Sequence, residues 1–295
     1  MQKVTLPNFN YQTIRTQNAD INTASAGSGA PLLLLHGYPQ THLMWHKIAP
    51  ALSEKFHLIC ADLRGYGDSS KPPSDEQHQT YSKREMANDM IEVMHQFGYD
   101  KFFVAGHDRG ARVTHRMALD HPDKILKAAV LDIVPTYEMF TQLDQAVATG
   151  YYHWLFLIQD NGLPEHLIGL DPDFYLKDKL KRWSQYPEQF DQRIVDDYLR
   201  CFRNPEAIHA SCEDYRAAAS IDLVHDEADL NLKIRCPLLV LWGKHGIMGK
   251  HFNMLDIWQQ KATRVSGTAL DSGHFLAEEA PEETLEQLVN FFELR

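Results

Sequence analysis

The sequence predicts an α/β protein in which a mostly parallel sheet is flanked by helices and carries one helical insertion. Three observations lead to this prediction. Short apolar runs that end at Gly, Pro or Asp recur along the chain, stretches with amphipathic helical spacing separate them, and one central segment has helical spacing with no clear strand. Strands that alternate with helices favour a parallel sheet, because each helix returns the chain to the starting edge.

The elements follow in chain order. Six apolar runs are too short for buried helices and predict strands, at residues 31–35, 58–61, 102–105, 128–133, 237–242 and 262–270. Three stretches place apolar residues on one helical face and predict helices, at residues 82–97, 112–119 and 282–294. The last of these closes the chain as an amphipathic helix.

The central segment, residues 137–229, is rich in aromatic and charged residues and predicts a cap of helices. Pro135 marks its start, and a new strand begins after Cys236 and Pro237. The sequence therefore predicts a core domain of residues 1–136 and 230–295 and a cap domain of residues 137–229. Open parallel sheets bind ligands beyond the carboxyl ends of their strands, so such an insertion would cover the site.

Composition excludes several classes of function. The chain has 29 Lys and Arg against 40 Asp and Glu, a formal charge of −11, which leaves no basic stripe for nucleic acid. Its apolar runs are shorter than a membrane span, and its start lacks the pattern of a signal peptide, so we expect a cytoplasmic protein. Four scattered cysteines and 16 histidines match no metal-binding spacing. We expect no metal or cofactor, a small-molecule substrate, and no nucleic-acid or membrane partner; a homodimer remains open.

Residues 106–110 have the layout of a nucleophile elbow. Gly106 and Gly110 flank Asp108 directly after a predicted strand and before helix-compatible residues. The sharp turn from strand to helix leaves no room for β-carbons at those two positions. By itself the pattern also fits an ordinary turn in which Asp108 caps the following helix.

Two more segments add the other parts of a hydrolytic site. Residues 36–39 follow a predicted strand, and their N–H groups could face the elbow as part of an oxyanion hole. His274 follows the last predicted strand, where the order nucleophile, acid, histidine expects it. The acid is absent after the strand at 237–242, and Asp132, at the end of the preceding strand, can take its place. Alternatively, His274 is a structural histidine and Asp132 caps a turn.

With these segments the chain resembles the α/β-hydrolase fold superfamily, and within it the haloacetate (fluoroacetate) dehalogenases. The resemblance covers essentially the whole chain and rests on residues 36–40, 61–69, 106–112, 115–122, 132–136 and 214–219. It implies hydrolytic removal of halide from a short 2-haloacid. It also implies that His153, Trp154 and Tyr215 of the cap receive the halide.

The residue chemistry agrees with that implication. A carboxylate such as Asp108 can displace a leaving group from saturated carbon and form an ester. His274, oriented by Asp132, would activate water against that ester, and the N–H groups of Tyr38 and Arg109 would hold the oxyanion. The guanidinium groups of Arg109 and Arg112 could grip a substrate carboxylate.

Alternatives remain open at this stage. Either arginine could pair with a protein acid, and the aromatic residues 151–156 could be ordinary cap core. Tyr215 leaves epoxide hydrolysis possible, and a non-catalytic receptor of the same fold would keep the pocket without turnover. Whether C–F or only C–Cl and C–Br bonds are cleaved depends on geometry that a sequence does not contain.

Overall fold

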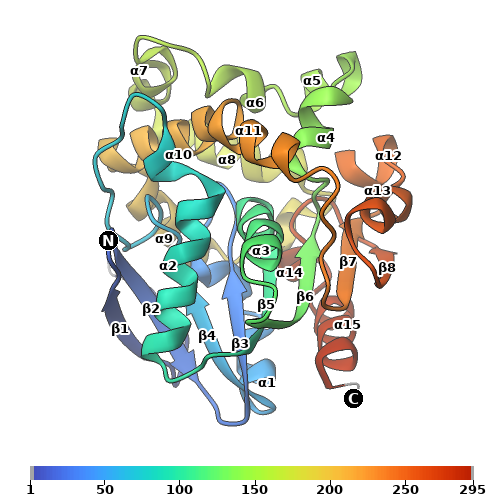
Figure 1. Ribbon diagram of the computed structural model, residues 1–295. Helices are drawn as coiled ribbons and strands as arrows, with labels where there is room; N and C mark the ends of the chain where they lie inside the picture. Colours follow the sequence, from blue (N-terminus) through green and yellow to red (C-terminus); the bar gives the residue numbers. More distant parts are fainter. Residues whose placement is uncertain (1–2, 294–295) are drawn as a thin grey trace.

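An eight-stranded sheet forms the centre of the computed structural model, which describes residues 3–293 (Figure 1). The strands lie in the order β1-β2-β4-β3-β5-β6-β7-β8, and every neighbouring pair from β4 to β8 is parallel. Their bounds are β1 Asn10–Arg15, β2 Asp20–Ala26, β3 Ala30–Leu35, β4 Phe56–Ala61, β5 Phe102–His107, β6 Ile125–Leu131, β7 Leu238–Gly243 and β8 Val265–Leu270. The predicted mostly parallel sheet flanked by helices is confirmed.

The sequence prediction missed β1 and β2, which pair antiparallel at one edge of the sheet. Both strands are rich in polar residues, and β1 is largely exposed, so neither contains the apolar run that marks a buried strand. The predicted strand at 128–133 ends too late. β6 stops at Leu131, because Asp132 takes a φ of +54°, outside the extended region.

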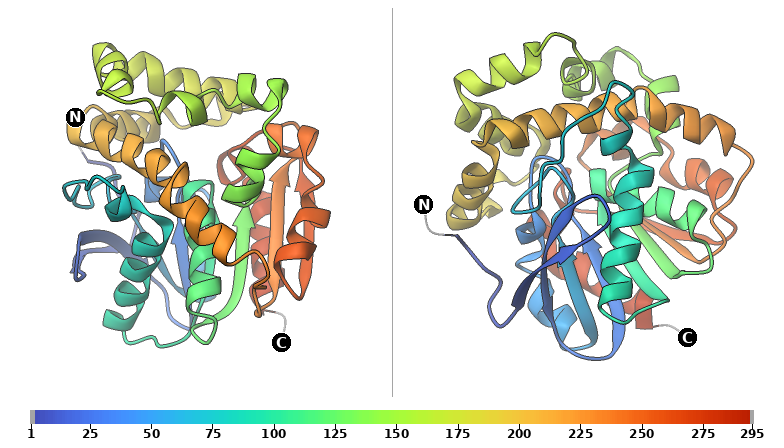
Figure 2. Two further views of the ribbon diagram at one scale, coloured as in Figure 1. Left: turned by 45° about the horizontal axis from the view of Figure 1, so that its top comes forward. Right: turned by 60° about the vertical axis from the view of Figure 1, so that its left-hand side comes forward.

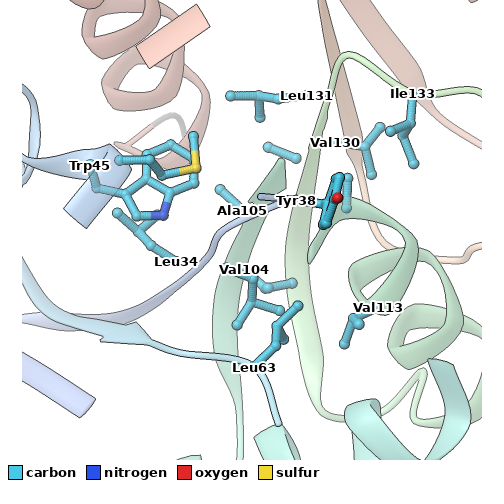
Figure 3. Close-up of a cluster of buried hydrophobic side chains, with 14 of the residues drawn as sticks. Leu34, Tyr38, Trp45, Leu63, Val104, Ala105, Val113, Val130, Leu131 and Ile133 are labelled. Carbon is cyan, nitrogen blue, oxygen red and sulfur yellow. The ribbon is translucent and has the colours of Figure 1, made fainter. Parts of the chain in front are cut away.

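The middle strands form the core because their apolar side chains are buried on both faces. Leu34 of β3, Val104 of β5 and Val130 of β6 are completely buried and belong to one cluster (Figure 3). Such near-continuous apolar runs are typical of strands covered on both sides. The core fixes where these strands end, and the functional side chains follow at those ends.

Helices of the two core segments cover the sheet. The predicted helix at 82–97 is α2, which begins after Ser82, whose Oγ accepts from the main-chain N–H of Glu85. The predicted helix at 112–119 is longer than expected, because α3 begins directly after the elbow at Arg109. In the closing helix α15, Phe292 packs on the rings of Phe56 and Phe103; its predicted last residue, Leu294, lies outside the described residues. The bounds are η1 His42–Trp45, α1 Ala49–Ser53, η2 Gln79–Tyr81, α2 Lys83–Gln96, α3 Arg109–Asp120, α12 Ile247–His251, α13 Met254–Lys261, α14 Leu276–Glu279 and α15 Pro281–Glu293.

Between β6 and β7 the chain is helical, and these helices lie above the carboxyl ends of the strands (Figures 1 and 2). We call residues 137–229 the cap segment; its separation from the core as a domain stays a prediction. Its helices are α4 Thr136–Thr141, α5 Gln145–Gly150, α6 His153–Phe156, α7 Leu163–Leu170, α8 Pro172–Trp183, η3 Pro187–Gln189, α9 Gln192–Phe202, α10 Pro205–Ala218 and α11 Ile221–Ala228. Within residues 3–293, no helix has the length and apolar character that crossing a membrane requires.

Candidate active site

Asp108 occupies the sharp turn between β5 and α3, with φ +46° and ψ −114°. This backbone conformation is strained for any residue with a β-carbon. Its neighbours must be glycines: a β-carbon on Gly106 would lie 2.3 Å from the carbonyl oxygen of Gly110, and one on Gly110 would lie 2.4 Å from that of His36. The turn therefore holds Asp108 at the carboxyl edge of the sheet, as the elbow pattern predicts.

The loop after β3 orients the Asp108 carboxylate. The main-chain N–H of Tyr38 donates a 2.8 Å hydrogen bond to Asp108 Oδ1. His36 shapes this loop, because its Nε2 accepts from the Leu63 N–H at 3.0 Å while its Nδ1 donates to the Gly37 carbonyl at 2.9 Å. The Tyr38 N–H thus lies where one donor of an oxyanion hole is expected.

His274 lies between two carboxylates. Its Nδ1 is 2.5 Å from Asp132 Oδ2, and its Nε2 is 3.9 Å from Asp108 Oδ2. The Gly243 N–H fixes the other oxygen of Asp132 at 2.9 Å. This arrangement leaves Nε2 facing the Asp108 carboxylate, within reach of a water that attacks at its carboxyl carbon.

The charges of the site shift the pKa values of both His274 and Asp108. Burial alone would lower the pKa of His274, but its hydrogen bond to Asp132 and the charges of Asp132 and Asp108 raise that pKa above the usual value. Burial alone would raise the pKa of Asp108, but the charges of His274 and the nearby arginines lower it below its usual value. Asp108 is therefore an ionised carboxylate at neutral pH.

Arg109 is held by a protein acid, which the sequence analysis left open as an alternative. Its Nε donates to Asp214 Oδ2 at 2.9 Å, and its Nη2 donates to Asp214 Oδ1 at 2.6 Å. The guanidinium stays within the site, since its Cζ lies 4.1 Å from the centre of the Tyr215 ring. Its buried Nη1 has no hydrogen-bond partner among the described residues. We expected Arg109 to offer a substrate two parallel N–H donors, but only Nη1 is free of a partner among the described residues.

Arg112 has no carboxylate partner in residues 3–293. Its Nη1 donates to the Val134 carbonyl at 2.8 Å, its buried Nε has no partner, and its Cζ lies 4.5 Å from the centre of the Trp154 ring. Burial and the charge of Arg109 lower the pKa of Arg112 to about 10, so it stays cationic at neutral pH. A buried cation without a counter-ion is costly, and the site is suited to binding an anion here.

The cap segment supplies a second set of donors. His153, Trp154 and Tyr215 are buried, and the ring centres of His153 and Tyr215 lie 5.3 Å apart. His153 Nδ1 and the Tyr215 hydroxyl have no hydrogen-bond partner among the described residues. Burial lowers the pKa of His153 well below its usual value, so this ring is neutral. The structure therefore brings the three predicted cap residues together beside Arg109 and Tyr38.

A cavity of about 350 Å³ reaches His274 from the junction of the cap segment and the core. Tyr151 and Trp183 line it, and both rings contact the imidazole of His274. The Tyr151 hydroxyl is 3.3 Å from His274 Nδ1. A small ligand could reach the site by this path.

Sequence reasoning missed the roles of Tyr151, Trp183 and Asp214 in building the site. Asp214 directly precedes Tyr215 in a segment that carried the family resemblance, and this was the one available signal. Tyr151 and Trp183 lie among other cap aromatics, and nothing in their spacing distinguishes them. Among the described residues, no cluster of three or more His, Cys, Asp or Glu side chains could hold a metal ion.

Comparison with known proteins agrees with this geometry. A family model described as alpha/beta hydrolase fold matches residues 30–281. The chain belongs to this family. The alpha/beta hydrolase fold assigned by the match is the one predicted from residues 36–40, 61–69 and 106–112.

Relatives within the family have two kinds of name. The chain is 43% identical to a fluoroacetate dehalogenase of Burkholderia sp. over 96% of its own length and 93% of the relative. It is 33% identical to a soluble epoxide hydrolase of Corynebacterium sp. (strain C12) over 91% and 92%. A crystal structure of an alpha/beta hydrolase from Nostoc sp. PCC 7120 has 55% identity and a TM-score of 0.98, covering 99% of this chain and 100% of that one.

Proposed function

We propose that this protein is a hydrolytic dehalogenase of short 2-haloacids, with haloacetate as its substrate. The observation that carries the proposal is the buried guanidinium of Arg112, which has no carboxylate partner among residues 3–293 and lies one helical turn after the ionised carboxylate of Asp108. A substrate that is both an anion and an electrophile at the adjacent carbon satisfies both groups. The name of the Burkholderia relative supports the same substrate class.

In the first step, Asp108 Oδ2 attacks the carbon that bears the halogen. The new C–O bond forms as the C–X bond breaks, and the electron pair leaves with the halide. The Arg112 guanidinium and Arg109 Nη1 hold the substrate carboxylate, while Oδ1 stays on the Tyr38 N–H. A carboxylate that is fixed and ionised needs no proton transfer in this step.

The departing halide needs hydrogen bonds to its developing charge, above all when it is fluoride. His153 Nδ1 and the Tyr215 hydroxyl are buried polar atoms without a partner among the described residues, and the Trp154 indole lies beside them. Because the three side chains are packed before the substrate binds, little reorganisation is required. We assign them to the halide.

In the second step, water hydrolyses the ester. Forming the ester removes the negative charge of Asp108, which is one of the causes that raise the pKa of His274. Formation of the ester therefore lowers the pKa of His274 and favours the neutral form that can act as a base. His274 takes a proton from water, the hydroxide attacks Asp108 Cγ, and the tetrahedral oxyanion is held by the Tyr38 and Arg109 N–H groups. The bond between Asp108 Cγ and the ester oxygen then breaks, and the departing alkoxide takes the proton from His274 to give a 2-hydroxy acid. The oxygen of water stays in the Asp108 carboxyl group, which loses its proton to solvent and is restored as a carboxylate.

The covalent ester gives the decisive test. In a His274→Ala variant the first step should proceed and the second should stall, so chloroacetate should leave a carboxymethyl group on the peptide that contains Asp108, detected by mass spectrometry. A His274→Ala, Asp108→Asn double variant is the control and should stay unmodified. An unmodified Asp108 in the single variant, with active wild-type protein, would refute the mechanism.

Epoxide hydrolysis is the second candidate, supported by two buried hydroxyls of the site, that of Tyr151 beside His274 and the unpartnered one of Tyr215, and by the name of the Corynebacterium relative. The hydroxyls of Tyr151 and Tyr215 could protonate an opening epoxide oxygen. A neutral epoxide offers no negative charge to pair with the cationic Arg112, and we therefore favour the haloacid as substrate. Halide release from chloroacetate, compared with diol formation from styrene oxide, separates the two candidates.

A further inference from the structure

Asp214 of α10 binds two cations at once. Its Oδ1 accepts from Arg109 Nη2 at 2.6 Å and also from Lys83 Nζ. Its Oδ2 accepts from Arg109 Nε at 2.9 Å and from the Tyr66 hydroxyl at 2.6 Å. Each of the four side chains is at most 6% exposed, so these contacts are shielded from solvent.

Lys83 joins the core to the cap segment. It is the first residue of α2, which belongs to the core, whereas Asp214 belongs to α10 of the cap segment. A second cap carboxylate, Asp222 of α11, accepts from the Lys83 N–H at 2.8 Å and lies 3.7 Å from its Nζ. Lys83 therefore joins both α10 and α11 to the first turn of α2.

The sharing of Asp214 affects the charge that a ligand would meet. A carboxylate paired with Arg109 alone would cancel the charge of that arginine. Lys83 pairs with Asp214 and also with Asp222, so the two cations and two carboxylates of this cluster together carry no net charge. Without Lys83 the cluster beside Arg109 would carry one negative charge, which would oppose the binding of an anion. The charges of Lys83 and Arg109 also act on each other, since that of Arg109 contributes to lowering the pKa of Lys83.

We propose that Lys83 is a positioning residue that sets the preference of this site for anionic substrates. It fixes Asp214, which orients Arg109 and directly precedes Tyr215, and its charge offsets the second carboxylate, Asp222, so that the cluster beside Arg109 does not become negative. This inference rests on the proposed function, because it assigns Lys83 to the recognition of the same substrate carboxylate. Lys83 touches neither substrate nor nucleophile in this role.

The test compares a charged substrate with a neutral one of similar shape. In Lys83→Met, kcat/KM for chloroacetate should fall about tenfold or more, which corresponds to about 1.4 kcal/mol, while kcat/KM for chloroacetamide should change by less than about threefold. Lys83→Arg should restore most of the preference for chloroacetate. Equal losses on both substrates, or no loss on either, would overturn the proposal.

A matched control removes another lysine that joins the core to the cap segment. Lys261 of α13 pairs with Glu138 of α4 at 2.7 Å, and neither residue belongs to the site. Lys261→Met should leave the ratio of the two kcat/KM values unchanged. If Lys261→Met lowers that ratio as much as Lys83→Met does, the effect comes from loosening the cap and the proposal fails.

Binding of glycolate, measured by calorimetry, separates this inference from the proposed function. Glycolate is a carboxylate anion that binds without turnover, and Lys83→Met should weaken its affinity about tenfold relative to wild type and Lys261→Met. If wild type releases no halide from any haloacid yet shows this pattern, the dehalogenase proposal fails and the role of Lys83 stands. If glycolate binds wild type and Lys83→Met equally, the role of Lys83 is refuted.

Discussion

The main-chain N–H of Tyr38 and Oδ1 of Asp108 are joined by a 2.8 Å hydrogen bond, although 70 residues separate them in the chain. This bond depends on Gly37, because a β-carbon there would lie 2.4 Å from the β-carbon of Asp108. Gly37→Ala must therefore push the oxyanion loop away from the nucleophile. We expect turnover of chloroacetate to fall by about 10²–10³-fold, the usual effect of losing one oxyanion donor.

Gly169→Ala is the control for that change. Gly169 is an exposed residue of α7 with nothing within 4 Å of an added β-carbon. Activity should stay unchanged, and the thermal midpoint should rise slightly, because alanine favours a helix over glycine by up to about 1 kcal/mol. A fully active Gly37→Ala enzyme would show that the loop does not hold the oxyanion.

The pH dependence of ester hydrolysis follows from the His274 environment. A general base must be neutral, so the rate of ester hydrolysis should be lost as pH falls through the pKa that His274 has in the ester. Asp132 still raises that pKa, whereas the charge of Asp108, which also raises it in the free enzyme, is absent from the ester. Asp132→Asn removes the main cause of the increase, so its midpoint should move to lower pH while the plateau rate falls by about 10²–10⁴-fold. Steady-state pH profiles of both enzymes check this, and an unshifted midpoint would contradict it.

Arg112→Met should weaken carboxylate recognition. A hydrogen bond to a charged group contributes about 1.5–3 kcal/mol, so KM for chloroacetate should rise at least tenfold while chloroacetamide is affected far less. Arg112→Lys keeps the charge and should recover part of the affinity, but lacks the planar donors. Equal KM values for wild type and Arg112→Met would place the substrate carboxylate elsewhere.

Tyr215→Phe tests the halide site. Fluoride depends on hydrogen bonds in the transition state more than bromide does, so removing the hydroxyl should slow fluoroacetate more than bromoacetate. We expect the ratio of the two kcat/KM values to fall about tenfold or more, measured by fluoride and bromide release side by side. If wild type releases no fluoride, the same comparison is made with chloroacetate and bromoacetate. An unchanged ratio of the two kcat/KM values would show that the Tyr215 hydroxyl does not bind the halide.

Glu278 gives a prediction about stability. Burial raises its pKa to about 8, and its Oε1 accepts from the Tyr198 hydroxyl at 2.8 Å. The folded protein therefore holds a proton that the unfolded chain releases near pH 4.5. The contribution of this proton to the free energy of unfolding is fully present below pH 4.5. It is lost as pH rises to about 8, by at most about 1.4 kcal/mol per pH unit.

Glu278→Gln cannot titrate and should therefore gain stability relative to wild type across that interval. Urea unfolding at pH 5 and pH 8 measures the difference, which should be small at pH 5 and a few kcal/mol at pH 8. Glu282→Gln, at an exposed position of α15, is the control and should show no such trend. A pH-independent difference would mean that Glu278 is ionised in the folded protein.

The parallel strands and the elbow could be predicted because local chemistry determines them. Apolar runs mark strands buried on both faces, and the glycines around Asp108 reflect a turn that tolerates no other residue. Strand β1 could not be predicted because it is an exposed edge, which needs no apolar run. Strand β2 is buried, but it consists largely of small and polar residues and therefore also lacks an apolar run. Strand order along the sheet also has no local signal.

The groups that bind the two arginines could not be predicted from the spacing of residues in the sequence. Arg109 and Asp214 are 105 residues apart and meet only when α10 folds over the sheet. Because Asp214 occupies two nitrogens of Arg109, the donors left for a substrate carboxylate are those of Arg112 and Nη1 of Arg109. The arrangement of Asp108, Asp132 and His274 was easier to predict from the sequence. Chain order placed His274 and Asp132 after strands that end at the same edge, and the structure brings them within 2.5 Å.

The cap segment enters and leaves the core at only two junctions, after β6 and before β7. Asp108, Asp132 and His274 all lie outside it, at the ends of separate strands. Recombination at those two junctions would replace the whole cap segment in a single event and leave Asp108, Asp132, His274 and Arg112 in place. Under the proposed function, such an exchange would alter which leaving group is accepted while the residues proposed for the bond-breaking steps stay unchanged.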